Sequence, residues 1–117
     1  MPPNEEIPIF SQAYDFYLTI HKSIRSLPKI ERHTIGETMD KEALILVKLT
    51  YLVRYAQQTQ KVSILDDIIQ RTDFVKILLR ILLDLNIMPI IVYTNLLKKS
   101  EEIGKMASGF KKYIAHR

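Results

Sequence analysis

The chain has 117 residues, 47% of them hydrophobic, and a net charge of +4. This length and composition indicate one domain that can bury a core without covalent or metal staples. Cysteine is absent, which excludes disulfides, thiolate metal sites and cysteine nucleophiles and fits a cytoplasmic protein.

The first eight residues contain three prolines and are expected to form a flexible leader, which leaves residues 9–117 as a single folded domain. Apolar residues then recur at three- and four-residue steps from Ile9 to Leu27, a pattern that predicts the first helix. The opening stretch MPPNEEIPIF has two acids where a secretory signal would be basic, so no signal peptide is expected.

Pro28 ends the first helical pattern, and a second one runs from about Lys29 to Gln57. Proline suits the start of a helix, and Glu31 in the first turn suits the positive end of the helix dipole. Lys29 and Arg32 are less favourable at that end, so capping alone does not account for the charge at this corner. The polar stretch QQTQK at 57–61 is the expected second corner.

A third helix is expected from about Ser63 to Leu85 and a fourth from about Ile90 to Ala115, with Pro89 at the corner between them. Residues 74–93 are strongly apolar, but charged residues interrupt them, and a membrane-spanning helix needs about 20 residues with few or no charges. No membrane insertion is therefore expected. Four long helices joined by short corners predict an all-α, antiparallel, up-down-up-down four-helix bundle.

Two of the expected helices are more apolar than a lone bundle requires. The sequence ALILVKLTYLVRYA at 43–56 is apolar almost all round, and residues 74–85 leave only one narrow polar stripe. A surface helix of a monomer needs a single apolar stripe. The excess predicts a second covered surface, most simply another copy of the chain, and hence a homo-oligomer.

No pattern of catalytic or metal-binding residues is apparent. The three histidines lack helical partners for a metal site, and the nearest approach is His33 with Glu37, a pair typical of surface contacts. Glu-x-x-His, a glycine-rich phosphate loop and a nucleophile elbow do not occur. We therefore expect no metal, no cofactor and no enzymatic activity.

The basic residues are better organised. Lys98, Lys105 and Lys112 are spaced by sevens and so line one helix face, while a second group surrounds the first corner. Such groups suit phosphate backbones, although a solvated helix face or, for Arg32, an ion pair across the bundle is an alternative. The candidate nucleic-acid-binding residues are Lys22, Arg25, Lys29, Arg32, Lys98, Lys105, Lys111, Lys112 and Arg117.

Three stretches carry a family resemblance. PKIERHTIG (28–36) resembles the first-corner signature of small four-helix-bundle proteins that include the ribosomal-RNA intervening-sequence proteins and the accessory variability determinant (Avd) of diversity-generating retroelements. LLRILLDLNIM (78–88) and EEIGKMASGFKKY (101–113) resemble segments of the Avd branch, and the three motifs keep the expected order.

The resemblance implies a homopentameric, barrel-like ring with a basic surface. It implies binding to DNA and RNA with little sequence preference, association with the retroelement reverse transcriptase, support of mutagenic copying, and no catalytic centre. Arg80 and Asp84 match polar positions of the second motif, which favours a structural or inter-subunit pair. The alternatives are a protein-interaction scaffold whose charges serve only solubility and a small helical nuclease.

Overall fold

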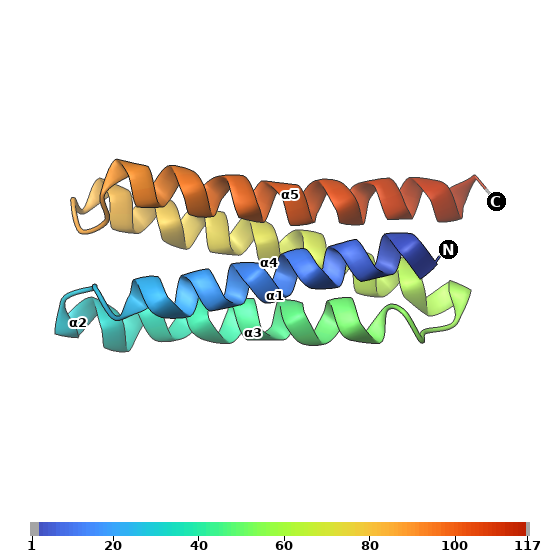
Figure 1. Cartoon of the computed structure of the whole chain (residues 1–117), viewed down its shortest axis with the longest axis horizontal. Helices are drawn as coiled ribbons and strands as arrows, with labels where there is room; N and C mark the ends of the chain where they lie inside the picture. The colour runs from blue at the N-terminus through green and yellow to red at the C-terminus, as the bar shows by residue number, and fades with distance from the viewer. Residues whose placement is uncertain (1–2, 117) are drawn as a thin grey trace.

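The computed structural model describes residues 3–116, with side chains from Pro8 onward, and within that range it contains helices and no strand. Four long helices run antiparallel in an up-down-up-down bundle, which confirms the expected fold (Figure 1). The second of them consists of three consecutive segments. The elements are α1 (Pro3–Ile24), α2 (Lys29–Glu31), the π-helical turn η1 (Arg32–Gly36), α3 (Glu37–Leu52), α4 (Gln58–Asp84) and α5 (Ile90–Ala115).

The bundle measures 47 × 20 × 19 Å. Helix α1 packs against α3 and α5, and α4 packs against the same two helices, so α1 and α4 form one diagonal pair and α3 and α5 the other. The start of α1 and the end of α5 lie at one end of the bundle, whereas the α1–α2 and α4–α5 corners lie at the other (Figure 1).

The helix boundaries agree with the sequence-based expectation where proline marks the corner. Pro28 precedes α2, and Pro89 precedes α5, whose bounds are as expected. Helix α1 instead begins at Pro3, so it includes most of the segment expected to be a leader, and Pro8 lies inside it. Proline is tolerated best near a helix start, where few backbone hydrogen bonds are lost. Residues 1 and 2 lie outside the described range.

The second corner lies earlier than expected. Helix α3 ends at Leu52 rather than Gln57, and α4 begins at Gln58 rather than Ser63, so most of QQTQK forms the first turn of α4. Gln57 is extended, with φ −68° and ψ 154°, and this conformation ends the corner. Residues 53–57 contain neither glycine nor proline, so no local signal marks the break.

All four long helices contribute to one core, represented by the fully buried side chains of Phe16, Leu46, Leu79 and Ile103. Three hydroxyls are also buried there, and each donates to the carbonyl three residues earlier in its own helix. They belong to Thr50, Thr72 and Ser100, with distances of 3.0, 2.7 and 2.8 Å. Because these hydroxyls are satisfied within their own helices, they do not constrain which helices pack together.

Candidate nucleic-acid interface

The first corner is built around a close approach between α1 and the π-helical turn. A Cβ atom added to Gly36 would lie 3.0 Å from Ile24 Cγ2 and 3.2 Å from the backbone oxygen of Glu31. Gly36 itself is buried and has ordinary helical dihedral angles. The glycine of the PKIERHTIG stretch is therefore required for space and not for backbone freedom.

Arg32 has a structural role at the same corner. One of its terminal guanidinium nitrogens, Nη2, donates a 3.2 Å hydrogen bond to the carbonyl oxygen of Leu27, which lies just beyond the end of α1. Because α1 has ended, no backbone N–H of a following helical turn donates to that carbonyl, and the arginine supplies the hydrogen bond instead. Within residues 8–116, the partner of Arg32 is this carbonyl and not an acid across the bundle, so that alternative is wrong.

We expect Arg32→Gln to lower the free energy of unfolding by about 1 kcal/mol, because a partly exposed carbonyl loses its donor. Urea unfolding at a fixed protein concentration measures this change. Arg25→Gln is the matched control, since Arg25 is an exposed arginine that directly follows α1. Equal stability of the two variants would contradict the role of Arg32.

A second polar cluster lies beside this corner. His21 Nδ1 of α1 lies 2.7 Å from Asp40 Oδ1 of α3, and the pair ties the two helices together. Burial, followed by the nearby Asp40 carboxylate, raises the pKa of Tyr17 above its ordinary value. The cluster borders a hollow of about 350 Å³ that also contains side chains of both charge signs from the π-helical turn and α3. No group of three or more potential metal ligands occurs in the described part of the chain.

The other candidate residues of the first corner are spread over its surface. Lys22 lies in the last turn of α1, Arg25 directly follows that helix, and Lys29 begins α2. All three are exposed. The structure places them at one end of the bundle, on its surface.

On α5, the structure separates the candidate lysines into two kinds. Lys98, Lys105 and Lys112 are exposed on one face, as their spacing predicts. Lys111 instead forms an ion pair with Asp66 of α4, so its ammonium group is engaged within the chain. A neighbouring lysine that was not a candidate, Lys99, pairs with Asp15 of α1 at 2.6 Å. Arg117 lies outside the described residues.

Two of the three exposed lysines of α5 border a groove between α4 and α5. Its volume is about 570 Å³, and its lining includes Lys105 and Lys112 together with Lys76 of α4. Sequence reasoning missed Lys76 because it treated the residue only as part of the polar stripe of one helix. The register of α4 against α5, which sets this neighbourhood, could not be obtained from either helix alone.

Arg80 and Asp84 form an ion pair within α4, with Arg80 Nε 2.9 Å from Asp84 Oδ1. The pKa of the Arg80 guanidinium is raised above its ordinary value. The largest cause is its hydrogen bond to Asp84, followed by the negative charge of Asp84 and then by the charge of Tyr93. Both side chains are exposed. The ion pair joins two residues of α4, while Arg80 also interacts with Tyr93 of α5. The pair borders an exposed row of apolar residues on α4.

That row, the α4 stripe, consists of Phe74, Ile77, Ile81 and Leu85, all exposed and spaced by three or four residues. A second uncovered surface, the aromatic row, runs across α1 and the end of α3. It comprises Phe10, Tyr14, Tyr51 and Tyr55, whose rings are in contact. The ring centroids lie 6.1 Å apart for Phe10–Tyr14, 6.3 Å for Phe10–Tyr51 and 5.4 Å for Tyr51–Tyr55. The two surfaces lie on different helices.

These features define a small all-helical bundle protein that carries a basic groove and two uncovered apolar surfaces. A family model described as bAvd-like matches residues 9–114. The chain belongs to the bAvd-like family, which confirms the resemblance seen in its three motifs. A search of curated proteins and a search of solved structures each found no match. Within the described residues, no helix is long and apolar enough to cross a membrane.

Proposed function

We propose that this chain is a non-enzymatic accessory protein of a diversity-generating retroelement. In this proposal it binds DNA and RNA and associates with the element's reverse transcriptase in the cytoplasm to support mutagenic copying. The observation that carries the proposal is the bAvd-like family match over residues 9–114.

The charge distribution supports the nucleic-acid part of the proposal. The net charge is +4, and exposed lysines occur at the first corner and along α5. Lysines attract phosphates through charge and the release of condensed counterions, so they bind nucleic acid without distinguishing its sequence. This fits an accessory protein that must accept many template sequences.

The two uncovered apolar surfaces support assembly into a homopentameric ring. The α4 stripe and the aromatic row are different surfaces, and a contact between unlike surfaces is heterologous. Heterologous contacts repeat from copy to copy and close into a ring when the rotation between copies permits it. Both surfaces would be covered in such a ring, which accounts for the apolar excess of helices α3 and α4.

The same apolar surfaces would also suit a protein-interaction scaffold that does not bind nucleic acid, and one experiment separates the two functions. Fluorescence anisotropy would measure binding of a labelled 20-nucleotide RNA–DNA hybrid at 50 and 200 mM salt. If about six phosphates are contacted, we expect the affinity to fall by about 1,000-fold between these conditions. No binding at 50 mM would favour the scaffold, and degradation of the RNA strand by the protein alone would favour a nuclease.

A further inference from the structure

The groove between α4 and α5 presents lysines from both of its walls. Lys76 comes from α4, and Lys105 and Lys112 come from α5. Seven residues of helix separate the last two, so they lie about 10 Å apart along the groove. Three ammonium groups along one open channel make a path for a chain that carries regularly spaced negative charges.

The acids of the groove do not cancel these charges. Asp73 and Glu101 also line it, which leaves an excess of one positive charge over the five ionisable side chains. The Oδ1 atom of Asp73 lies 3.5 Å from the Nζ atom of Lys76, a long contact between neighbouring turns of one helix. The Lys76 ammonium group is therefore held less closely than that of Lys111 and can still donate to a phosphate. Lys105 and Lys112 have no ion pair with a carboxylate among the described residues and are exposed, so both are available to an incoming phosphate.

Part of the α5 wall of the groove consists of residues with small side chains or none. Gly104, Ser108 and Gly109 line it, and a Cβ atom built on Gly109 would have no neighbour within 4 Å. Glycine inside an exposed helix destabilises the helix, and nothing in the free chain occupies the space that it leaves. That space gives a ligand direct access to the helix backbone between the two lysines of α5.

We infer that the α4–α5 groove binds the phosphodiester backbone of a single nucleic-acid strand, with Lys76, Lys105 and Lys112 contacting its phosphates. The groove runs between two packed helices, whose axes typically lie about 8–10 Å apart, so a single strand is the occupant that we assign to it. The inference rests on the proposed function, and it assigns nucleic-acid binding to one groove that includes Lys76 and excludes Lys111.

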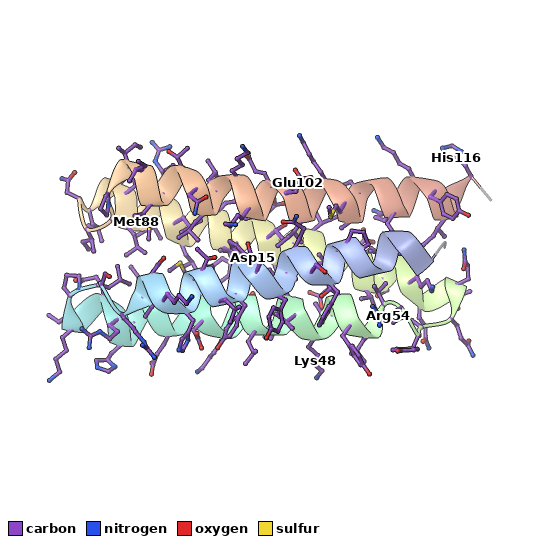
Figure 2. All side chains as sticks on the ribbon, viewed as in Figure 1. Asp15, Lys48, Arg54, Met88, Glu102 and His116 are labelled. Atoms are coloured by element: carbon purple, nitrogen blue, oxygen red, sulfur yellow. The ribbon has the colours of Figure 1, made fainter. Side chains whose placement is uncertain are left out.

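The test compares two variants that lose the same charge. The groove variant is Lys76→Gln/Lys105→Gln/Lys112→Gln. The control variant is Lys41→Gln/Lys48→Gln/Arg54→Gln, which changes residues on or just after α3, the helix diagonal to α5. Figure 2 shows Lys48 and Arg54 along the α3 side of the bundle and Glu102 on α5 across from them. Anisotropy of a labelled 20-nucleotide single-stranded RNA gives the affinity across a series of salt concentrations.

For the groove variant, we expect affinity at 100 mM salt to fall about tenfold or more relative to the control, and the slope of log affinity against log salt to decrease by about 2. Equal losses in the two variants would overturn the inference and leave the proposed function standing. A wild-type chain that binds no nucleic acid would overturn both. A changed subunit number in the groove variant would show a contact between copies and overturn the inference.

A third variant tests whether the space beside Gly109 in the α5 wall is needed for binding, without changing the charge of the protein. Gly109→Gln places a long neutral side chain between Lys105 and Lys112. We expect weaker RNA binding together with an unchanged or higher thermal midpoint, because glutamine favours a helix more than glycine does. Unchanged affinity would show that the strand does not approach α5 at this point and would overturn the proposed path.

Discussion

Replacing Ile77 with aspartate should convert the proposed homopentameric ring into monomers. Ile77 lies in the middle of the α4 stripe, and its side chain is 57% exposed in the single chain. The substitution therefore leaves the core of the monomer intact. In an assembled ring, the new carboxylate would be covered by a neighbouring copy without a partner charge.

The expected size of this effect follows from the cost of an unpaired buried charge. Leaving a charge uncompensated at a covered contact destabilises that contact by about 3 kcal/mol or more, which is more than 100-fold in its association constant. The loss is repeated at every contact of a ring, because each copy carries the same substitution. Light scattering coupled to size exclusion should therefore report a single chain.

Ile30→Asp is the matched control for Ile77→Asp. Ile30 is also an exposed isoleucine, but it lies in α2 at the first corner and outside the α4 stripe. An aspartate there is near a helix start, where negative charge is favourable. An Ile77→Asp protein with the subunit number of the wild type would show that the α4 stripe is not a contact between copies.

Gly36→Val should lower the free energy of unfolding by about 2 kcal/mol. The first added carbon would lie 3.0 Å from Ile24 Cγ2 and 3.2 Å from the backbone oxygen of Glu31, and valine adds two further methyl groups. The side chain of Ile24 can move slightly, but the backbone of the π-helical turn cannot retreat without separating from α1. Overpacking of this kind typically costs about 1–3 kcal/mol.

The same substitution at Gly109 separates crowding from helix propensity. Gly109 is an exposed helical glycine whose added Cβ would have no neighbour within 4 Å. Gly109→Val is therefore expected to be neutral or slightly stabilising, since valine forms helices better than glycine. Chemical unfolding of both variants at one protein concentration gives the comparison. Equal stability would show that the α1 corner tolerates a side chain at Gly36.

The sequence predicts the fold well where a single residue determines the backbone. Proline at 28 and 89 marks two corners, and α5 has the expected bounds. The corner at 53–57 has no such residue, so the residue pattern continues the second helix to Gln57, past the end of α3 at Leu52. The residue pattern also does not reveal the π-helical turn or the close approach of Gly36 to Ile24, because that approach involves a residue of another helix.

In the candidate site, too, the sequence predicts what one helix determines and not what depends on contacts between helices. The seven-residue spacing correctly places Lys98, Lys105 and Lys112 on one face, because a helix alone determines that face. The partner of Lys111 is Asp66, which lies 45 residues earlier and becomes a neighbour only when α4 and α5 pack together. Lys76 joins the groove for the same reason. Contacts between residues of different helices therefore could not be predicted from the sequence pattern of either helix.

The shared position of the two helix ends has a practical consequence for experiments on the proposed ring. Helix α1 begins and α5 finishes at the same end of the bundle, opposite the Pro28 corner (Figure 1). A fluorescent protein or affinity tag fused at either terminus would therefore emerge on that one side. In a ring of parallel bundles, all such fusions would crowd one rim and leave the other rim, with its exposed arginine and lysines, open to a partner.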